Sequence, residues 1–96
     1  MKLRLTPRAQ REATKERCEW RRRRDYVDIF DDELAEVLRF ILRSPKAARR
    51  AKRKGRECIY CLRMPKTQLH VYYRIDAAEI VVVHVWPMRK HRPPKL

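Results

Sequence analysis

Two different spacings of apolar residues divide the chain into a helical first half and a strand-rich second half. Up to residue 44 the apolar positions recur with the period of a helix face. From residue 57 onward the period is two, and β-branched and aromatic residues predominate, as they do in strands. The pattern predicts a strand, two helices and then three strands, with the strands at residues 2–5, 58–64, 69–75 and 79–86.

The first predicted helix begins at Pro7 and continues to about residue 24. The hydroxyl of Thr6 can accept a hydrogen bond from a backbone amide of the first turn, and proline suits the first helical position. Most of this segment is charged. Its apolar positions form one narrow stripe, made of Ala9, Ala13 and Trp20.

The second predicted helix begins with acidic residues and ends at Ser44. Asp28, Asp31, Asp32 and Glu33 place negative charge at its start, where the helix dipole favours it. Pro45 ends the helix, because the residue before a proline is disfavoured in helical conformation. Between these ends, the apolar residues share the spacing of a single buried face: Phe30, Leu34, Val37, Leu38 and Ile41.

The three C-terminal segments predict an antiparallel sheet. Residues 76–78 suit a tight hairpin connection between the last two strands. Residues 80–83 are apolar on both faces, which predicts a central strand. The predicted fold class is α+β with the order β-α-α-β-β-β, in which a helical hairpin packs on one face of a mainly antiparallel four-stranded sheet.

Positive charge is the dominant feature of the composition. The 96 residues carry a formal net charge of +14, and their number fits one domain covering 1–96. Such a charge favours a partner rich in negative charge, either a nucleic acid or an acidic protein. Seven of the eleven residues at 46–56 are basic. This run could be a solvated loop or helix end, but dense like charges more often mark a contact with a polyanion.

Several classes of protein are disfavoured by the same composition. No apolar run approaches the roughly 20 residues of a membrane span, and residues 1–6 lack a signal pattern. Three cysteines form no disulfide framework, so we expect a cytoplasmic protein without membrane contact. Cys58 and Cys61 have the spacing of half a zinc site, but a strand would place them on opposite faces. We expect reduced thiols, no metal and no cofactor.

His70, Tyr72 and Arg74 form the one group with catalytic character. Alternate residues of a strand project from the same face, so an imidazole, a phenol and a guanidinium could meet one phosphate. The alternative is an ordinary polar strand face. His84 lies among valines and is expected to be buried and hydrogen-bonded, and the two tryptophans, Trp20 and Trp86, are expected in the core.

Four segments together resemble the RelE/ParE toxin superfamily: LTPRA at 5–9, RFILRSP at 39–45, and the strand pair HVYYRID at 70–76 and IVVVHVW at 80–86. Members of this family are small basic toxins of bacterial type II toxin–antitoxin modules with a β-α-α-β-β-β fold. The resemblance therefore implies a cytoplasmic toxin that is neutralised by an acidic antitoxin. RelE-like members cut messenger RNA in the ribosome, whereas ParE-like members poison DNA gyrase and lack the nuclease residues.

The resemblance slightly favours gyrase as the target. The RelE pattern has basic residues at positions that are Ile59, Cys61 and Leu69 here, and many members have a histidine where this chain has Pro87. Whether the protein is an enzyme stays open; if it is one, the resemblance implies an endoribonuclease acting on mRNA. The alternatives are a small basic RNA-binding or ribosome-associated module without catalysis, and an inactive member of the family.

The candidate site residues follow from these patterns. The candidate catalytic residues are His70, Arg74 and His91. The basic cluster at 89–92 follows a rigid strand, so we expect its side chains to be free to meet a target. We expect the antitoxin to contact the basic run at 46–56 and the helical hairpin. The candidate contacts to a target or to nucleic acid are Arg53, Lys54, Arg56, Arg63, Lys66, Arg89, Lys90 and Arg92.

Overall fold

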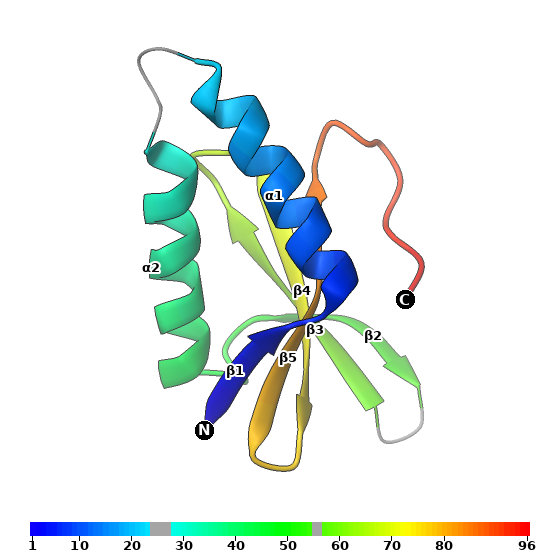
Figure 1. Cartoon of the computed structure of the whole chain (residues 1–96). Helices are drawn as coiled ribbons and strands as arrows, with labels where there is room; N and C mark the ends of the chain where they lie inside the picture. Colours follow the sequence, from blue (N-terminus) through cyan, green and yellow to red (C-terminus); the bar gives the residue numbers. More distant parts are fainter. Residues whose placement is uncertain (24–27, 55–56) are drawn as a thin grey trace.

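The computed structural model describes residues 1–23, 28–54 and 57–96, with only the backbone of Lys54 (Figure 1). The chain is α+β, as predicted, and each expected element is present. No helix of the described ranges is both long and apolar enough to cross a membrane. In chain order the elements are β1 (Lys2–Leu5), α1 (Pro7–Arg21), α2 (Ile29–Arg43), β2 (Arg49–Lys54), β3 (Glu57–Met64), β4 (Leu69–Asp76) and β5 (Glu79–Pro87).

The sheet has five strands rather than the four expected from the sequence, in the order β1-β5-β4-β3-β2. β1 runs parallel to β5, and the other neighbours are antiparallel. The additional strand is β2, which occupies most of the basic run and pairs with β3 along Arg49–Lys54. Its side chains lack the apolar alternation of the other strands, so the pattern does not reveal it. β5 lies inside the sheet as expected, but β4 holds the central position.

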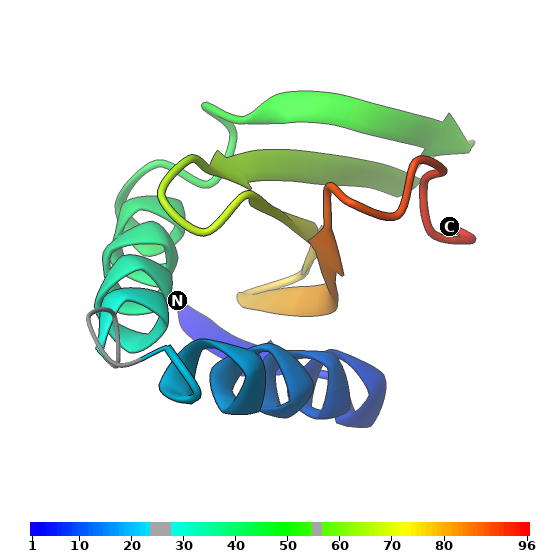
Figure 2. The same ribbon diagram turned by 90° about the horizontal axis from the view of Figure 1, so that it is seen from above.

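Both helices pack on one face of the twisted sheet (Figure 2). α1 contacts mainly β5, and α2 contacts α1 and β3. The predicted stripes are confirmed: Ala9 and Ala13 of α1 join the core, and so do Phe30, Leu34 and Ile41 of α2. The core side chains of the sheet on this face are Tyr60, Met64, Leu69, Val71, Tyr73, Ile80, Val82 and Val85.

The predicted start of the first helix and end of the second are also confirmed, whereas α1 ends at Arg21 rather than near residue 24. The amide of Ala9 donates a hydrogen bond to Thr6 Oγ1 at 3.1 Å, which caps α1, and α2 ends at Arg43, just before Ser44. β4 and β5 are joined by a two-residue hairpin, in which Ala77 adopts a φ of 47°. Such a left-handed conformation matches the turn type that two-residue hairpins favour.

Two glutamates that look like surface residues in the sequence are buried. Glu33 of α2 is 3% exposed and Glu16 of α1 is 2% exposed. The Glu33 carboxylate accepts hydrogen bonds from the amides of Lys66 and Thr67 at 2.7 and 2.9 Å, and from Thr67 Oγ1 at 2.6 Å. The second helix is therefore attached to the β3–β4 turn by polar contacts as well as by apolar packing.

Candidate functional site

The candidate site lies on the outer face of the sheet, opposite the helices. Four rings from β4 and β5 follow one another there, with centroid separations of 6.1, 6.3 and 5.7 Å and nearly perpendicular planes. We call this group the ring row, and it consists of His70, Tyr72, His84 and Trp86. The strand alternation predicted that His70 and Tyr72 share this face.

Two arginines from neighbouring strands influence the first ring of the row. Arg49 and Arg63 belong to β2 and β3, and Arg63 pairs with His70 across the β3–β4 ladder. Burial lowers the pKa of His70 below its ordinary value of 6.5, and the positive charges of Arg49 and Arg63 lower it further. The His70 imidazole is therefore neutral at pH 7 and can accept a proton.

The C-terminal tail, residues 88–96, folds back over the outer face. The indole nitrogen of Trp86 donates a hydrogen bond to the carbonyl of Arg92 at 2.8 Å, and His84 Nε2 lies 3.2 Å from the carbonyl of Lys95. Pro94, within the tail, is buried. The tail and three rings of the row line an open pocket of about 290 Å³, the outer-face pocket, whose lining includes His70, Tyr72, Trp86, Lys90, His91 and Arg92.

The structure brings together two of the three candidate catalytic residues. His70 and His91 both line the outer-face pocket, although they are far apart in the sequence. Arg74 does not line it, because its guanidinium pairs with Asp76 at 2.8 Å near the hairpin end of β4. Four residues of strand separate Arg74 from His70, or about 13 Å. The expectation that Arg74 joins His70 at one phosphate is therefore wrong.

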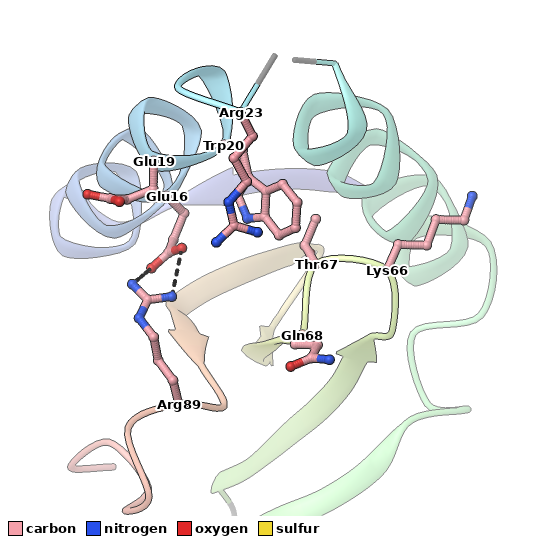
Figure 3. Close-up of a pocket in the computed structure, with 8 residues that line it drawn as sticks. All are labelled: Glu16, Glu19, Trp20, Arg23, Lys66, Thr67, Gln68 and Arg89. Carbon is pink, nitrogen blue, oxygen red and sulfur yellow. Dashed lines mark hydrogen bonds and ion pairs between the residues drawn. The ribbon is translucent and has the colours of Figure 1, made fainter. Parts of the chain in front are cut away.

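The other basic candidates lie in different places. Arg63 is exposed beside His70, and Arg53 is exposed on the edge strand β2. Lys66 lies in the β3–β4 turn, on the side of α1 and α2 (Figure 3). The side chain of Lys54 and the whole of Arg56 lie outside the described residues. The sequence analysis missed Arg49, whose charge reaches both His70 and Cys61.

Arg89 is not a free member of the C-terminal basic cluster. Its guanidinium forms two hydrogen bonds with the buried carboxylate of Glu16, at 2.8 and 3.3 Å (Figure 3). The hydrogen bond to Glu16 raises the pKa of Arg89. This pair forms one wall of a cavity of about 480 Å³ between α1 and the β3–β4 turn. The expectation of a free Arg89 side chain is therefore wrong, and Arg89 instead attaches the start of the tail to α1.

Replacing Arg89 by alanine should lower the free energy of unfolding by about 1–2 kcal/mol. The change leaves the buried Glu16 carboxylate without its partner, and the half-exposed position of Arg89 reduces the cost below that of a fully buried pair. Lys90→Ala is the control, with an expected change within about 0.5 kcal/mol. Urea unfolding of both variants measures the difference, and equal stability would contradict a structural role for Arg89.

The expectation that His84 is buried is confirmed, whereas the expectation that both tryptophans lie in the core is confirmed only in part. His84 is 6% exposed, and its Nδ1 lies 3.2 Å from both carboxylate oxygens of Glu12, so a buried, hydrogen-bonded histidine is confirmed. Trp20 is partly buried and packs against the core. Trp86 is not a core residue: it is partly exposed on the outer face, with the Lys90 ammonium 4.4 Å from its ring centroid.

The two cysteines of β3 lie on opposite faces, as the spacing predicted. Cys58 packs against the core, whereas Cys61 lies on the outer face and has Arg49 and Tyr72 as its cross-strand partners. Burial raises the pKa of the Cys61 thiol, which keeps it protonated at neutral pH. Within the described part of the chain, no group of three or more potential metal ligands gathers.

Comparison with known proteins identifies the fold. Neither a family model nor a curated protein matches the sequence. A chain of a solved structure, the "Chromosomal ParDE TA system from P. aeruginosa", is similar over 91% of this chain and 95% of its own length, with a TM-score of 0.64. This protein shares the fold of a chain of that ParDE structure. The two sequences are 11% identical, so the likeness concerns the fold, and it confirms the fold that the sequence resemblance implied.

Proposed function

We propose that this protein is the toxin of a bacterial type II toxin–antitoxin module, acting in the cytoplasm and neutralised by an acidic antitoxin. The observation that carries the proposal is the shared fold with a chain of a ParDE toxin–antitoxin structure, which extends over 91% of this chain. The net charge of +14 supports it as well, because it suits both an acidic antitoxin and a large anionic target.

The proposed target is DNA gyrase. The positions that are basic in the RelE pattern are Ile59, Cys61 and Leu69 in this chain, and two of them are buried, with Leu69 fully inaccessible. A buried leucine or thiol cannot meet the phosphate of a scissile RNA bond. The absence of basic groups at these positions favours inhibition of gyrase over mRNA cleavage by the RelE arrangement.

Ribosome-dependent mRNA cleavage is the second candidate, and the outer-face pocket is the observation that favours it. His70 is neutral at pH 7 and could take the proton of a ribose 2′-hydroxyl as that oxygen attacks the phosphate. His91 lines the same pocket and could return a proton to the leaving 5′-oxygen. Lys90 and Arg92 would supply the positive charge that stabilises the phosphorane.

Induced expression of the protein without an antitoxin separates these candidates. In the induced cells we expect growth to stop and mRNA to remain intact. In vitro, we expect the purified protein to inhibit DNA supercoiling by purified gyrase. Rapid mRNA decay that is lost in His70→Ala would instead support the nuclease. Normal growth at high expression would contradict the toxin assignment and favour an RNA-binding module without catalysis.

Association with an acidic antitoxin segment should be fast and should slow by about tenfold or more between low and high salt. The exposed basic side chains of the edge strand β2, Arg50, Lys52 and Arg53, provide the steering charge. Stopped-flow measurement of the association rate over a range of salt concentrations tests this expectation. Triple replacement of these side chains by alanine should flatten the dependence, and a wild-type rate independent of salt would contradict it.

A further inference from the structure

A second basic cavity lies where α1 crosses the edge of β5. β1 pairs with β5 only as far as Val82, so the following residues of β5 have no strand on that side. α1 takes the place of the strand: the Glu12 carboxylate accepts a hydrogen bond from the amide of Val85 at 3.0 Å and also faces His84 Nδ1. The tail approaches the same edge from the outer face, through the contact between His84 and the carbonyl of Lys95.

The space between α1 and the tail is a cavity of about 620 Å³, the edge cavity. Two arginines of α1, Arg8 and Arg11, line one side, and Arg92 and Lys95 of the tail line the other. The apolar part of the lining is the indole of Trp86 together with the ring of Pro93. Cationic side chains therefore surround an aromatic surface.

The residues that the structure describes do not compensate the positive charge of the edge cavity. Its one acidic residue, Glu12, already faces His84 and the Val85 amide. None of the four basic side chains forms an ion pair with any residue that the structure describes. The contacts that hold the tail use the backbone carbonyls of Arg92 and Lys95, which leaves both side chains free. Backbone contacts thus hold both sides of the cavity in place, and its four basic side chains are able to bind an anion.

We propose that the edge cavity binds a nucleotide, with its phosphates held by the four basic side chains and its base packed against Trp86 and Pro93. The planar guanidinium of arginine matches phosphate oxygens in a bidentate geometry, and bases pack readily on aromatic side chains. An acidic peptide could form ion pairs with the four basic side chains, but its carboxylates would not pack against the Trp86 indole. The nucleotide could be a free nucleoside polyphosphate or one unit of a single-stranded nucleic acid. The proposal does not depend on the toxin assignment.

The test uses the full chain and four probes: ATP, inorganic triphosphate, a labelled single-stranded RNA hexanucleotide, and an oligoglutamate of matched charge. Replacing Arg8 and Arg11 together by alanine should weaken binding of ATP and of the hexanucleotide by about tenfold or more. The same change should reduce the slope of log affinity against log salt for the hexanucleotide by about 1.4, as expected for two lost phosphate contacts.

The matched control removes two positive charges outside the cavity by replacing Arg39 and Arg43, both exposed on α2, with alanine. We expect this control to bind within about twofold of wild type, as judged by fluorescence anisotropy and calorimetry. Equal weakening of the control would show a nonspecific effect of charge and overturn the proposal. Thermal unfolding of both variants verifies that they are folded.

The probes distinguish the source of the nucleotide. Competition by ATP against the hexanucleotide supports the site and indicates that a free nucleotide suffices, whereas hexanucleotide binding without competition supports a single strand as the source. Triphosphate binding as tight as that of ATP, oligoglutamate binding as tight as that of RNA, or no binding of either nucleotide probe would each overturn the proposal. Growth assays are independent of these measurements, so failure here leaves the toxin assignment intact.

Discussion

Replacing Glu33 by alanine should lower the free energy of unfolding by about 3–4 kcal/mol. The buried carboxylate accepts three hydrogen bonds from the β3–β4 turn, two of them from the amides of Lys66 and Thr67. Without it, Thr67 keeps buried donors that have no acceptor, and each such group costs about 1–3 kcal/mol. The loss is a large share of the roughly 5–15 kcal/mol that a domain possesses.

Glu36 offers a matched control on the same helix. It is exposed, and its replacement by alanine should change the free energy of unfolding by no more than about 0.5 kcal/mol. Urea unfolding of the two variants, monitored by tryptophan fluorescence, gives both values. If Glu33→Ala and Glu36→Ala were equally stable, the hydrogen bonds between α2 and the β3–β4 turn would make no contribution to the free energy of unfolding.

The largest effect on function is expected from replacing Lys90 and His91 together by alanine. Both side chains line the outer-face pocket. Each lost charge-assisted contact should cost about 1 kcal/mol or more, so target binding should weaken by roughly 30- to 100-fold. Induced cells should then form colonies, while the melting temperature of the purified variant should stay close to that of wild type, because surface changes rarely destabilise a fold.

The interpretation of this experiment depends on leaving Arg89 in place, because its pair with Glu16 is structural. The control is the double replacement of Arg39 and Arg43 by alanine, which removes two exposed positive charges on α2 and should leave toxicity intact. A folded Lys90→Ala/His91→Ala protein that still stops growth would contradict the placement of the target contacts at this pocket. The next position to test would then be Arg63 beside His70.

The order and the class of the elements could be predicted because apolar periodicity reports directly on burial. The stripe of α2 and the alternation of β4 both match the observed core. The strand β2 could not be predicted in this way, since it lies at the edge of the sheet and carries mostly basic side chains. Its place depends on backbone pairing with the next strand, β3, and such pairing leaves no pattern in the side chains of β2.

The candidate site could be predicted only where strand alternation places residues on the same face. Alternation placed His70 and Tyr72 together, but it could not show that Arg74 would turn to Asp76 or that Arg89 would reach Glu16 on α1. Buried glutamates look like surface residues in a charged helix, because their burial depends on donors elsewhere in the chain. The tail has no periodicity, and its position over the ring row follows from two contacts to backbone carbonyls, those of Arg92 and Lys95.

The two edge strands of the sheet, β1 and β2, are protected against self-association by different means. β1 is an edge strand of only four residues, which offers little backbone for another strand to pair with. β2 is longer, but it carries mostly basic side chains, so an identical strand approaching it would bring like charges together. Copies of this protein therefore repel one another at the edge where strand addition is otherwise easiest. We expect a polypeptide that extends the sheet there to carry carboxylates, because the same charges that keep copies of this protein apart favour an acidic partner.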